Sequence, residues 1–190
     1  MIIILNAPAG AGKDTIQRAI ASMFETGSLS FKKPMFEMAH AILGDLGYSE
    51  FMDAYNDRNR KEAPLEILKG SSPRQFMIWI SETIIKPAFG DKHFGNLLYD
   101  DYNVKQNEGF DICVVSDGGF PDETITLIEK GAVVKLFRMH RDGYSFDGDS
   151  RNYVHLPDHI GVNGYQEFDV NIYDGKPVEA ALDIFHLATE

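Results

Sequence analysis

The hydrophobic positions of this chain form two patterns, one typical of buried strands and the other of amphipathic helices. Continuous apolar runs predict strands covered on both faces, as in a parallel sheet. Three such runs lie at 2–6, 112–116 and 133–137, and weaker strands are predicted at 29–31 and 169–173. The pattern therefore predicts a mostly parallel sheet of about five strands.

Apolar residues spaced three and four apart predict helices between these strands. The clearest start is Ser72-Pro73, because serine caps a helix and proline suits its first turn. The predicted helices span 13–24, 34–43, 72–85, 121–130 and 177–187. Strands that alternate with helices indicate a three-layer α/β fold. An α+β domain with a mixed sheet is the alternative.

Two segments, 44–71 and 142–168, lack strand signals and are rich in Asp, Asn, Gly and aromatic residues. Segments of this kind are expected to form mobile flaps over a site. The 190 residues contain no internal repeat and no low-complexity tract, so a single domain over 1–190 is expected.

Composition narrows the classes of partner. The chain has 18 Lys and Arg against 29 Asp and Glu, a net charge of −11, which argues against a long nucleic-acid track but allows a small anionic ligand. The single cysteine, Cys113, excludes a disulfide framework and fits a reducing compartment. No apolar stretch approaches the roughly 20 residues that span a bilayer, and the first residues do not resemble a signal peptide. A cytoplasmic protein without a membrane partner is expected.

The segment between the first strand and the first helix carries the strongest chemical signal. A buried strand runs into small residues and then into a lysine at a helix start, which is the context of a phosphate-binding P-loop. Backbone N–H groups would surround phosphate oxygens, the helix N-terminus would add positive charge, and Lys13 would reach the β- and γ-phosphates. An ordinary glycine-rich turn is the alternative. The predicted nucleotide-binding residues are Pro8, Ala9, Gly10, Ala11, Gly12, Lys13, Asp14 and Thr15.

This segment departs from G-x-x-x-x-G-K-[ST] at two positions. Ala7 replaces the first glycine, and Asp14 stands where a hydroxyl would hold Mg²⁺. Thr15 follows directly and can offer its hydroxyl. Asp117 ends a predicted strand, where a carboxylate can bind Mg²⁺ through water or accept hydrogen bonds from a substrate; a turn or capping aspartate is the alternative. Asp14, Thr15 and Asp117 are therefore the predicted metal site.

Arg74 lies in the first turn of the helix that Ser72 opens. Its guanidinium fork and the free N–H groups of the turn suit a monophosphate, although a solvated surface arginine is the alternative. Arg58, Arg60 and Lys61 form a local basic cluster, which is either a solvated helix face or reaches a substrate.

Several motifs, taken in order, give the chain a family resemblance. It resembles the deoxynucleoside monophosphate kinases of large tailed bacteriophages, within the P-loop nucleoside monophosphate kinase superfamily. In that family an aspartate follows the P-loop lysine, as Asp14 does here, whereas Ala7 is unusual and an arginine is common where this chain has Gly119. The resemblance rests on Gly12-Lys13-Asp14-Thr15, on 32–36, 72–77, 114–117 and 120–123, on Arg138, and on 171–175.

The resemblance implies a P-loop kinase that uses ATP and Mg²⁺ to phosphorylate deoxynucleoside 5′-monophosphates. Its catalytic residues would be Lys13, Asp14, Asp117, Arg74 and Arg138. Helices within about 34–105 would bind the acceptor. A lid within about 142–168, bracketed by Arg138, Arg141 and Arg151, would close over the donor. A homodimer in a host cytoplasm is also implied.

Two alternatives stay open at the level of the sequence. The same kinase chemistry could serve another acceptor, such as a 5-hydroxymethylated nucleotide, hydroxymethyluracil in DNA, or dephospho-coenzyme A. The chain could instead be a catalytically silent nucleotide-binding module, which Ala7 and Gly119 keep open. ATP binding without transfer to any acceptor would identify such a module.

Overall fold

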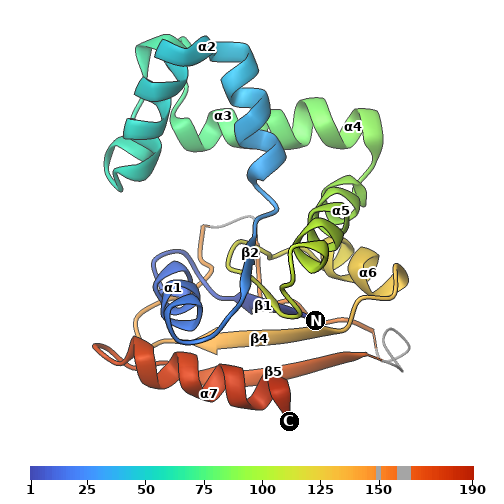
Figure 1. Cartoon of the computed structure of the whole chain (residues 1–190). Helices are drawn as coiled ribbons and strands as arrows, with labels where there is room; N and C mark the ends of the chain where they lie inside the picture. Colours follow the sequence, from blue (N-terminus) through green and yellow to red (C-terminus); the bar gives the residue numbers. More distant parts are fainter. Residues whose placement is uncertain (149–150, 158–163) are drawn as a thin grey trace. The chain divides into compact units, whose positions relative to one another are not determined.

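The computed structural model describes residues 1–148, 151–157 and 164–190. The chain forms two compact units, one made of 1–31 and 94–190 and the other of 32–93. The first unit contains the sheet, and the second is built from helices (Figure 1).

The sheet of the first unit confirms the predicted fold class. Five parallel strands lie in the order β2-β3-β1-β4-β5. All five residues of the central strand are buried, which is why its sequence is a continuous apolar run. The strands are β1 (Ile2–Asn6), β2 (Gly27–Leu29), β3 (Cys113–Val115), β4 (Val134–His140) and β5 (Tyr165–Asn171).

The two weaker strands exist, but their predicted bounds were wrong. β2 begins at Gly27, which pairs with Cys113 of β3. A Cβ at residue 27 would lie 2.7 Å from Cys113 Sγ, so only glycine lets the two strands approach here. β5 begins at Tyr165, four residues before the predicted start. It is an edge strand with alternating polar and apolar residues, so it lacks the continuous apolar run used to find the others. Residues 165–168 therefore belong to the sheet and not to a flap.

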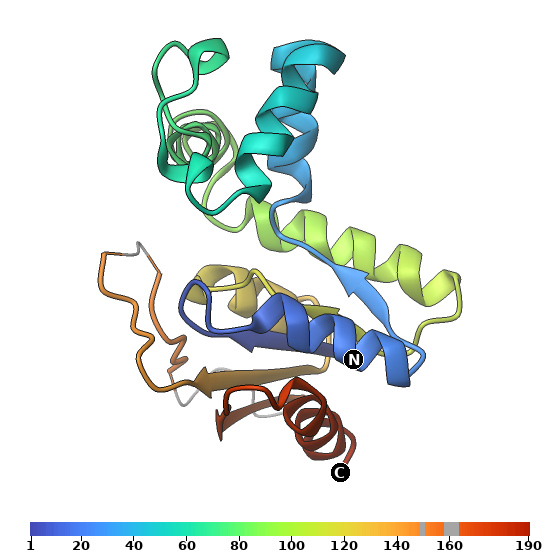
Figure 2. The same ribbon diagram turned by 90° about the vertical axis from the view of Figure 1, so that its left-hand side faces the viewer.

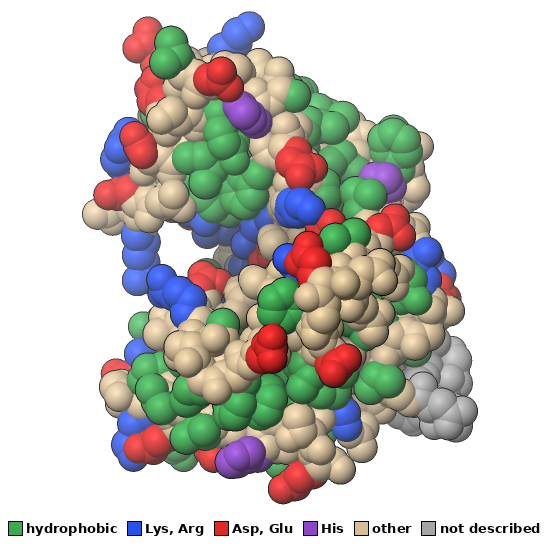
Figure 3. All heavy atoms as spheres, viewed as in Figure 1, with side chains coloured by type: hydrophobic (Ala, Val, Ile, Leu, Met, Phe, Trp, Pro, Cys, Tyr) green, Lys and Arg blue, Asp and Glu red, His purple; other side chains and the backbone are tan. Residues whose placement is uncertain are grey.

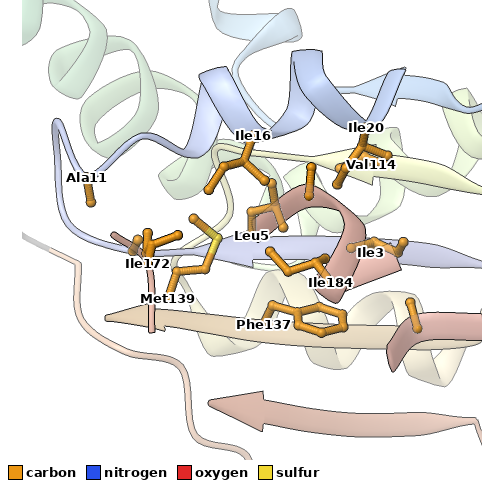
Figure 4. Packing of buried hydrophobic residues seen from close by; sticks show 13 residues of the cluster. Ile3, Leu5, Ala11, Ile16, Ile20, Val114, Phe137, Met139, Ile172 and Ile184 are labelled. Carbon is orange, nitrogen blue, oxygen red and sulfur yellow. The ribbon is translucent and has the colours of Figure 1, made fainter. Parts of the chain in front are cut away.

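Helices on both faces of this sheet make three layers. α1 (Lys13–Met23) and α7 (Pro177–Thr189) cover one face, and α5 (His93–Asn107) and α6 (Pro121–Glu129) lie on the other (Figure 2). Between the first pair and the sheet lies a core with the alternate residues Ile3 and Leu5 of β1 (Figure 4). The rings of Phe24 and Phe185 stack at 3.6 Å beside that core. This core fixes the start of α1 against the end of β1.

The second unit contains α2 (Lys33–Asn56), α3 (Pro73–Trp79), a π-helical stretch (Ile80–Ile85) and α4 (Lys86–Phe89), with short 3₁₀ turns at Arg60–Glu62 and Glu66–Leu68. The cap predicted at Ser72 is confirmed: its hydroxyl accepts from Gln75 N at 3.2 Å, and the Gln75 side chain accepts from Ser72 N at 2.9 Å. This capping box fixes the turn that carries Arg74.

The helix predicted at 34–43 is longer than expected and takes in the first part of the segment 44–71, which was predicted to be a flap. α2 bends at Gly44, whose φ of 65° suits glycine, and then continues to Asn56. The second half is held by aromatic packing, since Phe51 is fully buried and contacts the rings of Tyr55 and Phe76. Glycines at the bend weaken the helical pattern of the sequence, and tertiary contacts stabilise the helix.

The surface of the first unit has exposed apolar residues at its carboxyl-terminal end, among them Tyr173, Val178 and Leu187. Figure 3 shows hydrophobic side chains on this part of the surface with acidic side chains among them. Within the described ranges, none of the helices is long and apolar enough to cross a membrane. The implied homodimer stays a prediction.

Candidate functional site

The glycine loop, residues 7–12, joins β1 to α1. Gly10 and Gly12 have φ of 77° and 107°, a left-handed conformation that favours glycine. Ala11 N donates to Pro8 O at 3.3 Å, which closes the loop into a turn. Gly12 is the N-cap of α1, and among the described residues no side chain caps this helix. The amide groups of its first turn therefore form a positive helix end that suits an anion.

Lys13 brings its charge into this loop. Its side chain is buried, and Nζ donates to Ala7 O at 2.5 Å and to Pro8 O at 2.7 Å. The backbone carbonyl of Ala7 makes this contact, and any residue would supply it. Ala7 also lies outside the left-handed region, so its position does not require glycine. The departure at residue 7 therefore leaves the shape of the loop intact.

Asp14 connects the first turn of α1 to the end of β3. Ser116 Oγ donates to Asp14 Oδ1 at 2.7 Å, and Ser116 is itself buried. Thr15 lies beside Asp14 at the exposed start of the helix. Arg18, which the sequence analysis did not select, donates to Asp14 O at 3.2 Å and lies 3.5 Å from Thr15 Oγ1. The i and i+4 spacing of Asp14 and Arg18 on one helix was the available signal.

Asp117 lies one residue beyond Ser116 and uses both carboxylate oxygens. Oδ2 accepts from Ser30 Oγ at 2.6 Å, and Oδ1 accepts from Phe31 N at 3.0 Å. These bonds connect the chain after β2 to the end of β3. The arrangement suits both predictions made from the sequence, a turn aspartate and a metal-organising one.

The glycine loop and Asp117 occupy a favourable place in the topology. The chain leaves β1 towards α1 on one face of the sheet, and it leaves β3 towards α6 on the other face (Figure 2). Neighbouring strands whose connections diverge in this way leave a crevice at their carboxyl ends, where α/β proteins bind ligands. The structure therefore brings Lys13, Asp14, Thr15 and Asp117 to one edge of the sheet.

The predicted Mg²⁺ site can be tested against these donors. Across the residues that the structure describes, no group of three or more His, Cys, Asp or Glu is arranged to hold a metal ion. In nucleotide sites, however, Mg²⁺ needs only one or two carboxylates together with phosphate oxygens and water. Asp14 and Asp117 fit that kind of site, and Thr15 adds a hydroxyl.

Arg141 lies closer to the loop than the sequence indicated. Its Nη1 donates to Ala11 O at 3.1 Å, while Nε and Nη2 donate to Asp174 Oδ1 at 2.8 and 2.5 Å. A cavity of about 280 Å³ opens beside these groups. Its lining includes Ala11, Thr15, Arg141, Tyr173, Gly175 and Pro177. The sequence did not reveal this pocket, because Arg141 and Asp174 are 33 residues apart.

Arg138 has a different environment. Its guanidinium donates to both Asp169 oxygens at 3.1 and 2.8 Å, and to Glu167 on the same strand. These carboxylates raise the pKa of Arg138, Asp169 most of all, and the guanidinium in turn holds the pKa of Asp169 well below its usual range. Nη1 also donates to Val154 O at 3.1 Å. The structure thus joins Arg138 to β5 and to the strap, residues 151–157, whereas its catalytic role stays a prediction.

The strap forms part of the predicted lid. Its backbone is fixed by Asn6, since Asn6 Nδ2 donates to Asn152 O at 3.3 Å and Val154 N donates to Asn6 Oδ1 at 2.8 Å. Leu156 N donates to Glu167 on β5. Of the other residues in 142–168, the structure describes 142–148, Gly164 and the first residues of β5, whereas 149–150 and 158–163 lie outside the described part of the chain.

Arg74 belongs to the second unit. Nε donates to Glu62 Oε1 at 2.6 Å, with both side chains partly exposed. Nearby, Lys61 Nζ lies 3.6 Å from the ring centroid of Tyr55, and burial lowers the pKa of this lysine. Arg74 and Lys61 therefore lie in one basic part of this unit, whereas Arg58 and Arg60 are exposed.

The first unit is thus a three-layer α/β fold with an all-parallel sheet and a strand–glycine loop–helix element at its crevice. No protein-family model matches the chain, and no curated protein sequence matches it. The residues of the site are therefore the basis for assigning a function.

Proposed function

We propose that this protein is a phosphotransferase that moves the γ-phosphoryl group of ATP to the phosphate of a deoxynucleoside 5′-monophosphate in the cytoplasm. The observation that carries the proposal is the glycine loop, with Lys13 inside it and the positive end of α1 behind it. That geometry supports a polyphosphate site. The nature of the acceptor rests on the family resemblance.

The donor nucleotide would lie along the edge of the sheet. Backbone N–H groups of the loop and of the α1 start would surround its phosphates, and Lys13 would extend to the β- and γ-phosphates. The cavity beside Arg141 would take the base, because a guanidinium and the ring of Tyr173 both suit stacking on a flat heterocycle. Asp14, Thr15 and Asp117 would hold Mg²⁺ or its waters, and the bound ion would neutralise phosphate charge.

The acceptor would use Arg74, with Lys61 as a second cation of the same unit. An oxygen of its phosphate forms the new bond to the γ-phosphorus, and the bond from that phosphorus to the β–γ bridging oxygen breaks, leaving ADP. The attacking oxygen is already ionised near neutral pH, since the second pKa of a phosphate monoester is about 6. No general base is required, so the work of the protein is positioning and charge neutralisation.

The silent module is the second candidate, and the structure weakens the reasons for it. Ala7 contributes a backbone carbonyl that any residue supplies, and the space beside Gly119 is filled by Arg151. Ala7 and Gly119 therefore leave the glycine loop complete. A different acceptor of the same kinase chemistry remains an outcome for experiment.

The test is an ADP-release assay with ATP and Mg²⁺ against common and 5-modified deoxynucleoside monophosphates. Dephospho-coenzyme A and hydroxymethyluracil-containing DNA serve as rival acceptors. We expect turnover with one or more monophosphates. Arg74→Ala should raise the acceptor KM by about tenfold, the loss of one charge-assisted phosphate contact, with a smaller change for ATP.

Lys130→Gln is the matched control for that variant, because it also removes one positive charge but at an exposed position at the end of α6. Turnover only with a rival acceptor would replace the substrate and keep the kinase chemistry. ATP binding without any turnover would contradict the proposed function and identify a binding module.

A further inference from the structure

Arg74 uses only part of its guanidinium within the second unit. Nε donates to Glu62 Oε1 at 2.6 Å, and the arginine side chain is 37% exposed. Among the residues that the structure describes, none accepts a hydrogen bond from Nη1 or Nη2. Two N–H groups of one guanidinium can bind two oxygens of a phosphate in parallel. Glu62 therefore holds one edge of the guanidinium and leaves both Nη groups for a ligand.

A short turn fixes the carboxylate that makes this contact. Asp57 Oδ1 accepts from Asn59 N and from Arg60 N, at 2.9 Å each. Lys61 N donates to Asp57 O at 2.9 Å, and Lys61 and Glu62 are neighbours on the 3₁₀ turn at 60–62. The capping box described above fixes the turn that carries the arginine. Both members of the ion pair are thus placed by backbone that side chains hold.

Lys61, the neighbour of Glu62, is a cation without a carboxylate. Its Nζ lies 3.6 Å from the ring centroid of Tyr55, and no carboxylate of the described residues forms an ion pair with it. Burial is the main cause that lowers the pKa of Lys61, and the nearby positive charges of Lys32 and Arg74 lower it further. A partly desolvated ammonium group near other cations is unfavourable until an anion compensates it. The surroundings of Lys61 therefore favour an anionic ligand.

We propose that Glu62 is a positioning residue of a phosphate site formed by Arg74 and Lys61, and that it holds the arginine with both Nη groups ready for a terminal phosphate. The inference rests on the acceptor half of the proposed function and assigns a role to a residue that the sequence analysis did not select. An exposed ion pair contributes little to the stability of a fold. Fixing a long side chain before binding, however, removes an entropic cost that the ligand would otherwise meet.

The charge of Glu62 acts in the opposite direction, because a carboxylate repels a phosphate and competes with it for Arg74. In the proposed role, positioning outweighs this repulsion. Glutamine separates the two effects, since its amide oxygen can still accept from Nε but carries no charge. Glu62→Gln should therefore bind phosphate at least as tightly as the wild type. Glu62→Ala, which removes the acceptor as well, should bind phosphate more weakly.

The experiment titrates inorganic phosphate into the full chain and follows the side-chain signals of Arg74 and Lys61 by nuclear magnetic resonance. We expect Glu62→Ala to raise the Kd of phosphate about three- to fivefold, the scale of one exposed ion pair. Arg74→Ala combined with Glu62→Ala should be no worse than Arg74→Ala alone, because Glu62 acts through the arginine. In the kinase assay, Glu62→Ala should raise the acceptor KM by a similar factor with little change in kcat.

Glu108→Ala is the matched control. Glu108 forms an ion pair of the same length, 2.6 Å, with Lys105 of the first unit. The side chains of Lys105 and Glu108 are 32% and 47% exposed, against 37% and 52% for Arg74 and Glu62. This variant changes the net charge by the same amount, so it reports any general effect of charge. It should leave the Kd of phosphate unchanged.

Tighter phosphate binding in both Glu62→Ala and Glu62→Gln would make Glu62 an internal competitor and would overturn its positioning role. An unchanged Kd in Glu62→Ala, additive losses in the double variant, or a wild-type protein whose Arg74 and Lys61 signals do not respond to phosphate would overturn it too.

These outcomes are distinct from failure of the proposed function. A protein that binds phosphate at Arg74 but transfers no phosphoryl group fails as a kinase, while the Kd of phosphate still decides the role of Glu62. A protein that phosphorylates a monophosphate, and whose Glu62→Ala variant binds phosphate as the wild type does, keeps the proposed function and loses this inference.

Discussion

The segments that follow β1 and β4 leave the same edge of the sheet but are held in different ways. The glycine loop after β1 is shaped by its own backbone, with Lys13 bonded to carbonyls five and six residues away. The chain after β4 is held by side chains distant in the sequence, namely Asn6 of β1, Glu167 of β5 and Asp174 of the turn after β5. Each segment contributes cations to the crevice region.

The contrast extends to the two buried cations, Lys13 and Arg138, which are 8% and 7% exposed. Lys13 donates to carbonyl oxygens of the loop, whereas Arg138 donates to the carboxylates of Asp169 and Glu167. A guanidinium paired with two carboxylates contributes to strand association, because removing one partner leaves the others unpaired. Burial and charge alone therefore do not identify which cation binds a ligand.

The largest expected effect comes from removing the loop cation. Lys13→Ala should lower kcat/KM by roughly a thousandfold, since one preorganised donor to a reacting phosphate contributes on this scale. Its hydrogen bonds to Ala7 O and Pro8 O lie within its own loop, so the thermal midpoint should change little. Steady-state kinetics with the best acceptor and a thermal melt check both statements. Activity within a few-fold of the wild type would contradict a role of the glycine loop in the mechanism.

Substitutions of Asp14 and Asp117 test the predicted metal site at the crevice. Asp14→Asn should raise the Mg²⁺ concentration for half-maximal activity by about tenfold, since it weakens one carboxylate–metal interaction. Asp117→Asn should also raise this concentration, and it should in addition lower the free energy of unfolding by about 1–2 kcal/mol, because its oxygens accept from Ser30 and Phe31. A metal titration and urea unfolding of both variants provide the measurements. An unchanged metal titration in Asp117→Asn would make that residue a turn aspartate.

Arg138→Gln tests whether the second buried cation, which is paired with the carboxylates of β5, stabilises the fold. It should lower the free energy of unfolding by about 2 kcal/mol, less than the loss expected for a fully buried ion pair, because Asp169 is largely exposed. The activity of the folded protein should fall far less than in Lys13→Ala. Denaturant unfolding and kinetics on the same preparation decide the matter. Unchanged stability with abolished turnover would give Arg138 the catalytic role that its sequence position suggested.

The smallest expected effect is a pH dependence of the free energy of unfolding, which arises from the ion pairs of Arg138 with Asp169 and Glu167. The hydrogen bond with Arg138 holds the pKa of Asp169 below that of an ordinary carboxyl group. Burial would raise the pKa of Glu167, but hydrogen bonds from Tyr165 and Arg138 outweigh it and lower this pKa as well. The unfolded chain therefore binds protons more readily in acid, and stability rises with pH there. The contribution should be complete above the unfolded values of about 4 and should be lost as the pH falls through the lower folded values.

Unfolding free energies of the wild type and Asp169→Asn, measured from neutral to acidic pH, provide the check. The difference between the two proteins should be constant near neutral pH and should shrink as the solution is acidified below about pH 4. A difference that grows in acid would contradict the direction of the pKa shifts.

The elements predicted well are those whose signal is local. β1 and the helix after it lie where the apolar run, the glycines and Lys13 indicated. The bounds of β5 were wrong because its residues alternate as an edge strand, and α2 was cut short because Gly44 bends it without ending it. In both cases neighbours distant in the sequence decide the structure.

The sequence by itself determined the parallel sheet, the loop and the placement of Lys13 and Asp14, because the backbone preferences of glycine and the burial of continuous apolar strands act over a few residues. The tertiary structure alone decided what the arginines do. Arg138 is paired with Asp169, 31 residues away, and Arg141 with Asp174, 33 residues away. Arg151 meets Gly119 only because Asn6 fixes the strap across the ends of the strands. A long, charged side chain takes its role from whichever partner the fold brings within reach, and no local pattern specifies that partner.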